Sequence, residues 1–119
     1  MARLWRSLVS VIALAAIALP CNAGYTIKSI VTRVTVQAGI VYINVNSDPT
    51  VDAPFAACAT QTRYAFDGRT PEGKMFYTGL LSAYLTKVPV QIYGNGTCDA
   101  DPSHSSETLT AFLTLSDWW

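Results

Sequence analysis

The chain has 119 residues, of which 50% are hydrophobic and 13% are charged, and its eight basic residues balance its eight acidic ones. A chain of this length is sufficient for one domain with a modest core. Because it is almost neutral and has no basic cluster, we expect it to bind neither nucleic acid nor an anionic membrane surface.

The first 23 residues are typical of a secretory signal peptide. Two arginines in the first six residues give a basic start, and residues 8–19 form an uncharged apolar run. Small residues then precede a predicted cut after Ala23. The apolar run is shorter than the roughly 20 residues of a membrane span, so no membrane span is expected. A lipid-modified Cys21 is an alternative, although Pro20 stands where lipoprotein signals have a small residue.

Residues 24–119 are predicted to form a single domain that is secreted or periplasmic. Six basic against eight acidic residues give this part a formal net charge of −2. Its two cysteines, Cys58 and Cys98, predict one disulfide, because an even pair in an exported protein is normally oxidised. Closing that loop stabilises a fold by about 4 kcal/mol at most. A metal site is the alternative, but two Cys and one His without close spacing do not favour it, so no metal or cofactor is expected.

Three β-strands are predicted in the first half of the domain. Tyr25–Gln37 is rich in β-branched residues, and its two phases of alternation indicate a bulge or bend near Ser29–Ile30. A turn at Ala38–Gly39 leads into Ile40–Asn46, which alternates regularly between apolar and polar residues. A loop with two prolines follows, and then a third strand is predicted over Ala57–Phe66.

A helix is predicted from Pro71 to about Lys87. Thr70 suits the N-cap position, and proline is favoured at the first helical position. One apolar stripe is expected to face the core, formed by Tyr77, Leu81, Tyr84 and Val88. A second edge, formed by Phe76, Ala83 and Lys87, is expected to be available to another subunit.

Two further strands are predicted, Val88–Tyr93 and Glu107–Leu115. The fold class is therefore mostly β with one helix (α+β). Five strands with a helix between the third and the fourth predict an OB-like Greek-key barrel, in the order β-β-β-α-β-β.

The segment from Cys58 to Tyr93 carries a resemblance to a known family. Its features are a cysteine in the predicted third strand, the helical pattern Tyr77-x-x-Leu80-Leu81-x-Ala83-Tyr84 and the run Lys87-Val88-Pro89-Val90-Gln91-Ile92-Tyr93. In these the chain resembles the small B subunits of subtilase-type and pertussis-like bacterial AB5 toxins, and also a wider set of small exported bacterial proteins. The resemblance implies an OB-fold, a pentamer with helices lining a central channel, and glycan binding on the outer face. It assigns no sugar-contacting residue to this chain.

No catalytic motif is present, so we expect no enzyme activity. His104 is the only histidine, and the serines beside it are too close in sequence to indicate a preorganised triad. Asp48 and Asp52 share one loop, and Asp99 and Asp101 share another. Turn formation by the aspartate side chains explains these pairs better than calcium binding does.

Aromatic side chains are the candidate binding residues. Tyr42, Tyr93 and Phe112 are predicted on outward strand faces, and Trp118 and Trp119 end the chain. A stacking surface for a sugar is one interpretation. Packing at a subunit interface or at the mouth of the barrel is the other.

Two functions follow from these observations. The first is a secreted, non-enzymatic binding module, an oligomeric glycan-binding subunit like those of the toxins. The alternative is a periplasmic structural or protein-interaction domain without sugar binding. The expected partner is thus a glycan or a protein, and a homo-oligomer is expected, a pentamer by analogy.

Overall fold

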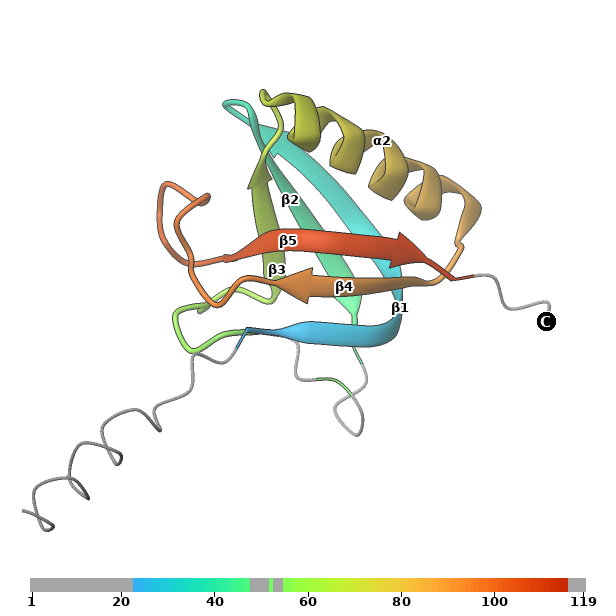
Figure 1. The fold of residues 1–119 in the computed structure, drawn as a ribbon, viewed down its shortest axis with the longest axis horizontal. Helices are drawn as coiled ribbons and strands as arrows, with labels where there is room; N and C mark the ends of the chain where they lie inside the picture. The colour runs from blue at the N-terminus through green and yellow to red at the C-terminus, as the bar shows by residue number, and fades with distance from the viewer. Residues whose placement is uncertain (1–22, 48–51, 53–54, 116–119) are drawn as a thin grey trace, which may run out of the picture.

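The computed structural model describes residues 23–47, 52 and 55–115. Residues 1–22 of the predicted signal peptide and the two C-terminal tryptophans, Trp118 and Trp119, lie outside the described residues. The elements, labelled as in Figure 1, are β1 (Tyr25–Gln37), β2 (Ile40–Asn46), β3 (Arg63–Asp67), α2 (Pro71–Thr86), β4 (Val90–Gly94) and β5 (Glu107–Thr114). The prediction of a mostly β fold with one helix is confirmed.

The five strands form one mixed sheet whose two ends pair with each other (Figure 1). The order is β1-β2-β3-β5-β4, and β4 pairs with β1 to complete the circuit. Only β3 and β5 pair in parallel among the described strands; the other pairings are antiparallel. Each of these strands therefore has a neighbour on both sides, and we call the whole the closed sheet.

The long strand β1 belongs to both halves of the closed sheet. Its register shifts between Thr26 and Ser29 against β4, and between Val31 and Arg33 against β2. The bend that the sequence predicts near Ser29–Ile30 lies between these two shifts. The turn to β2 has φ of 51° at Ala38 and 82° at Gly39. Two positive φ values are typical of the hairpin turns whose twist matches that of the strands.

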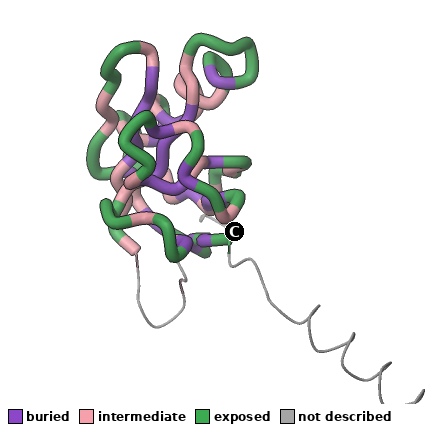
Figure 2. The backbone as a smooth tube through the Cα atoms, turned by 90° about the vertical axis from the view of Figure 1, so that its left-hand side faces the viewer, coloured by how far each residue is buried: buried purple, intermediate pink, exposed green. Residues whose placement is uncertain are grey.

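The core fills the inside of the closed sheet and the space beneath α2. Figure 2 shows the buried residues gathered in the interior of the body and the exposed ones around it. The exposed residues lie in the loops and also on α2 and β1. The fully buried apolar side chains include Val31, Ile43, Tyr64, Leu80, Val90 and Ile92. These come from four of the strands and from the helix, so the core requires the whole topology to be in place.

The start of α2 is as predicted, and its most buried side lies at one edge of the expected stripe, whose Tyr77 and Tyr84 pack against the core. The Thr70 hydroxyl accepts a hydrogen bond of 2.9 Å from the amide of Gly73. The side turned to the core carries Leu80 and Ala83, whereas the expected stripe through Tyr77 is only half-buried. The prediction that Phe76 and Ala83 are available to another subunit is therefore wrong, because Ala83 is buried and Phe76 packs against the core. Small side chains let the helix approach the sheet closely. No helix of the described part is long and apolar enough to span a membrane.

The third strand is shorter than predicted, and Cys58 precedes it in a loop. The amides of Thr60 and Gln61 both donate to the carbonyl of Ser105, at 2.9 Å each, instead of pairing with a strand. The predicted disulfide is confirmed: Cys58 is bonded to Cys98, with 6.1 Å between the Cα atoms. It joins this loop to the loop between β4 and β5.

Phe112 points inward, and the outward prediction is wrong. A register shift between β4 and β5 places Leu109 opposite Gly94 and Ala111 opposite Tyr93, so one residue of β5 is extra. Beyond that bulge the alternation reverses. Phe112 packs edge-on against Phe76 of α2, with 5.9 Å between the ring centroids. A Cβ on Gly79 would lie 2.5 Å from the Phe112 ring, so this approach requires glycine.

Candidate functional site

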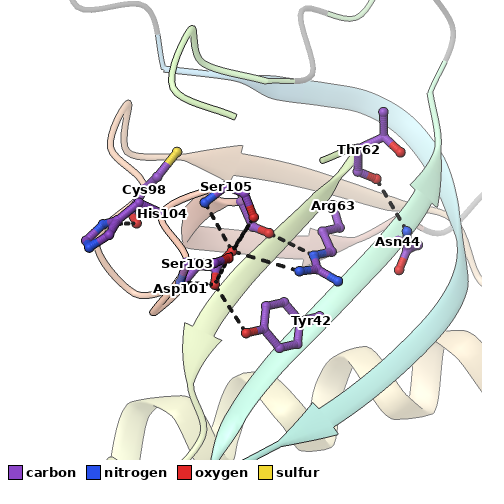
Figure 3. Close-up of polar contacts among 10 residues, drawn as sticks. Tyr42, Asn44, Thr62, Arg63, Cys98, Asp101, Ser103, His104 and Ser105 are labelled. Carbon is purple, nitrogen blue, oxygen red and sulfur yellow. Dashed lines mark hydrogen bonds and ion pairs between the residues drawn. The ribbon is translucent and has the colours of Figure 1, made fainter. Parts of the chain in front are cut away.

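A cleft of about 360 Å³ lies where the β1–β2 turn, β3 and the loop before β5 meet. Figure 3 shows side chains from β2, β3 and that loop converging there. The cleft is lined by Gln37, Ala38, Tyr42, Arg63, Asp101, Pro102 and Ser103. Its volume is at the lower end of the range of small-molecule sites.

Tyr42 and Arg63 form one wall of the cleft. Tyr42 faces away from the core on β2, as its alternation predicts, but only 7% of it is exposed. The guanidinium carbon of Arg63 lies 4.1 Å from the centre of the Tyr42 ring and covers it, a favourable cation–π arrangement. The Arg63 Nε donates to the Ser106 hydroxyl at 2.8 Å. Neighbours on two sides therefore hold the guanidinium in one orientation.

The loop beside this wall is folded around Asp101, whose side chain is fully buried (Figure 3). Asp101 Oδ1 accepts from the amide of Ser103 at 2.9 Å, from its hydroxyl at 2.8 Å and from the Tyr42 hydroxyl at 3.3 Å. Oδ2 accepts from the hydroxyl of Ser105 at 3.0 Å and lies 3.9 Å from Arg63 Nη2. The loop is thus fixed against β2 and β3 by one carboxylate.

Electrostatics keep Asp101 ionised and Tyr42 protonated. Burial alone would raise the pKa of Asp101, but hydrogen bonds from Ser103, Ser106 and Ser105 outweigh it and hold the pKa well below its usual range. Burial, and then the negative charge of Asp101, raise the pKa of Tyr42 above its ordinary value. The Tyr42 hydroxyl therefore remains a donor to Asp101 at physiological pH.

Polar side chains continue from the cleft across the outer face of the sheet. Arg33 of β1 pairs with Asn44 of β2, and Asn44 pairs with Arg63 of β3. Residues paired across antiparallel strands project from the same face. This row therefore presents two guanidinium groups and one amide on one side of the molecule.

Among the described residues that the sequence predicts for binding, Tyr42 lines the cleft and the others do not. Tyr93 lies on the outer face of β4, 38% exposed, and its hydroxyl accepts a hydrogen bond from the Gln91 side chain. Phe112 lies beneath α2, and the two tryptophans are outside the described residues.

Sequence reasoning missed Arg63 and Asp101 as site residues. Asp101 does form the expected turn, because its carboxylate bonds the amide two residues ahead. The serines at 103, 105 and 106 were the available signal, because hydroxyl groups close to an aspartate in sequence can hydrogen-bond its carboxylate and fix the loop. Arg63 had no comparable signal, because its position over Tyr42 depends on the register of β3 against β2.

Two other features of the described part are weaker candidates. His104 is exposed and has a backbone φ of 54°. Its Nδ1 lies 3.2 Å from the carbonyl oxygen of Cys98. The described residues contain no group of three or more His, Cys, Asp or Glu side chains that could hold a metal ion. A second cleft of about 360 Å³ between the β1–β2 hairpin and α2 is lined mainly by apolar groups, and its Arg69 is bonded to Asp67 at 2.9 Å.

Comparisons with protein-family models, with curated proteins and with solved structures find no match to this chain.

Proposed function

We propose that this protein is an exported, non-enzymatic binding module that takes a glycan in the cleft between β2, β3 and the loop before β5. The observation that carries this proposal is Arg63, stacked on Tyr42 and oriented by Ser106 beside the fixed Asp101 loop. Preorganised polar groups at the edge of a cleft give orientation and specificity at little entropic cost.

We assign the closed sheet to the OB-fold. Five strands with a helix after the third support this assignment, and so does the circular strand order. Members of that fold bind oligosaccharides and oligonucleotides across strands 2 and 3, between the loops that follow strands 1 and 4. In this chain the same two loops border the cleft. The resemblance to the toxin B subunits favours the oligosaccharide.

The row of Arg33, Asn44 and Arg63 favours a glycan that carries a carboxylate. Guanidinium groups bind carboxylates through two parallel hydrogen bonds, and amides bind sugar hydroxyls. Sialylated glycans have this chemistry, whereas a neutral glycan offers no carboxylate to the guanidinium groups. We therefore expect the acidic sugar to bind at the Arg63 end of the cleft.

A glycan array on the purified exported protein tests the class of ligand, and titration with sialyllactose and with lactose tests the acidic group. We expect binding of sialyllactose and at least tenfold weaker binding of lactose. No binding to any glycan of the array would contradict the glycan proposal and favour the alternative given below.

Matched variants locate the site. Arg63→Lys keeps the charge but loses the planar fork, so we expect at least a tenfold loss of affinity. Arg69→Lys, at the Asp67 pair, is the control and should bind normally. Because Arg63 also contacts the loop, Gln37→Ala is a second test at an exposed lining residue, with Gln61→Ala as its control. Equal binding by all four variants would place the ligand elsewhere.

The second candidate function is a protein-interaction or structural domain of the periplasm. Exposed apolar side chains on the outer face of β1, β4 and β5 favour it: Tyr25 is 37% exposed, Tyr93 38% and Leu113 45%. Such a face also suits the homo-oligomer, a pentamer by analogy, that the resemblance implies. Sedimentation of the exported protein at micromolar concentration tests this, and a monomer would contradict self-association. The disulfide supports a location outside the cytoplasm, secreted or periplasmic.

A further inference from the structure

A second buried carboxylate lies away from the cleft, at the start of β5. Glu107 is fully buried. Its Oε2 accepts hydrogen bonds from the amides of Gly24 at 2.8 Å and Gly96 at 2.9 Å, and its Oε1 accepts one from the amide of Ala56 at 2.7 Å. These donors precede β1, follow β4 and precede β3, respectively. One side chain thus joins three segments that are far apart in the sequence.

Glu107 has no cationic side chain against it in the described part of the chain, where the ion pairs are Arg63–Asp101 and Arg69–Asp67. A buried charge without a counter-charge is costly, even when amides solvate it. The Tyr64 phenol, a titratable neighbour within the described residues, brings no positive charge either. Burial, and then the charges of Glu107 and Asp52, raise the pKa of the neighbouring Tyr64 phenol.

Gly24 is the residue that follows the cut predicted after Ala23. It is buried, whereas Ala23 is exposed. Its carbonyl accepts a hydrogen bond of 2.8 Å from the amide of Gly94, at the point where β1 begins to pair with β4. The sheet therefore holds the Gly24 nitrogen against Glu107 from the first residue of the predicted mature chain.

We propose that cleavage after Ala23 creates the counter-charge of Glu107, because the α-ammonium group of Gly24 then occupies the place of its amide. A leader-removing protease hydrolyses the Ala23–Gly24 bond: the hydroxyl of water goes to the carbonyl carbon of Ala23 and its hydrogen to the Gly24 nitrogen. That nitrogen takes up one more proton from solvent at neutral pH. A neutral hydrogen bond to Glu107 thereby becomes a charge-assisted one. Removal of the leader thus stabilises the folded domain in addition to separating it from the leader.

The first experiment is to export the full chain from a bacterial host and to determine the N-terminal residue of the product by mass spectrometry. We expect Gly24. A mature protein that begins at any other residue would overturn the proposal, because its amine would not lie against Glu107.

The second experiment removes the charge without changing the sequence. Cyanate at mildly acidic pH in urea carbamylates the α-amine in preference to lysine, since the α-amine has the lower pKa. After refolding, urea titration should show at least a tenfold lower ratio of folded to unfolded molecules at pH 7 than for the untreated protein. The α-amine is expected to have a raised pKa in the folded state, so its stabilisation is complete below about pH 7.7 and is lost as pH rises through the folded pKa.

The carbamylated and untreated proteins should therefore converge in stability at high pH, where the α-amine of the untreated protein is also neutral. Equal stability at pH 7 would overturn the proposal. If the treated protein fails to refold, an NMR titration of the untreated protein decides: an α-amine pKa above the ordinary range of roughly 7.7–8.0 supports the ion pair. A value within or below that range contradicts it.

Discussion

Asp101 and Glu107 are both fully buried carboxylates, six positions apart, yet their surroundings differ in kind. Asp101 is bonded mainly by hydroxyls and amides of its own loop, with Arg63 as a nearby cation. Glu107 is bonded by backbone amides of three distant segments. The hydroxyl donors of Asp101 can be removed one side chain at a time, whereas the donors of Glu107 all belong to the backbone. Asp101 therefore organises one loop and the cleft, and Glu107 holds the chain together.

The largest effect is expected from Glu107→Ala. The backbone nitrogens of Gly24, Ala56 and Gly96 would lose their acceptor, at about 1–3 kcal/mol each. We therefore expect a loss of about 4 kcal/mol or more in the free energy of unfolding. Urea denaturation of the exported protein measures it. Glu72→Ala, an exposed acid in the first turn of α2, is the control and should change little. A loss below about 1 kcal/mol would contradict the central role of Glu107.

Replacing both Cys58 and Cys98 by serine should cost about 3 kcal/mol, from the lost restriction of the unfolded chain. Each cysteine lies two residues after a donor to Glu107, namely Ala56 and Gly96. Hydrogen exchange should therefore accelerate more at these two amides than at Ser103, which bonds Asp101. Equal acceleration at all three amides would mean that the disulfide does not stabilise the surroundings of Glu107 more than the Asp101 loop.

Asp101→Asn should cost about 2 kcal/mol near neutral pH, since hydrogen bonds to a charged group are lost. Because the pKa of Asp101 is lowered by folding, its contribution is present above the ordinary aspartate pKa of about 3.9 and is lost as pH falls below it. Urea midpoints measured from pH 7 to pH 2 should thus fall more steeply for the natural protein than for the variant. Parallel profiles would show that protonation of Asp101 is not the cause of the loss of stability at low pH.

The smallest effect is expected from Ser103→Ala, which removes one of several hydroxyl donors to Asp101. We expect a loss of about 1 kcal/mol and a pKa of Asp101 closer to its usual value. NMR titration of the carboxyl and urea unfolding measure the two quantities, with the exposed Ser82→Ala on α2 as control. A cost as large as that of Asp101→Asn would show that the donors act as one unit rather than singly.

Local patterns were sufficient to predict β1, β2, the start of α2 and the start of β5. Alternation, turn residues and the Thr70 cap act over a few residues, and the structure has these boundaries as expected. The face of Phe112 and the shortness of β3 were not predictable in this way. The first depends on a bulge against β4, and the second on amides that bond Ser105 of a distant loop.

The candidate cleft was predictable only through Tyr42, whose outward direction follows from alternation in β2. Arg63 on the same wall comes from β3, and the loop beside that wall lies some 40 residues further along the chain. The Cys58–Cys98 bond, with its separation of 40, joins these two regions. Pairings at such separations depend on the strand order and register of the whole sheet. A short window of sequence contains neither.

The close approach at Gly94 couples the choice of residue at two positions of the chain. A Cβ at this position would collide with the carboxylate of Glu107, so a side chain at 94 and an acid at 107 exclude each other. Glycine at 94 and glutamate at 107, which are thirteen residues apart, should consequently be kept or lost together as the sequence diverges. A side chain at 94 would displace the carboxylate of Glu107, and the backbone nitrogens of Gly24, Ala56 and Gly96 would then lose their shared acceptor.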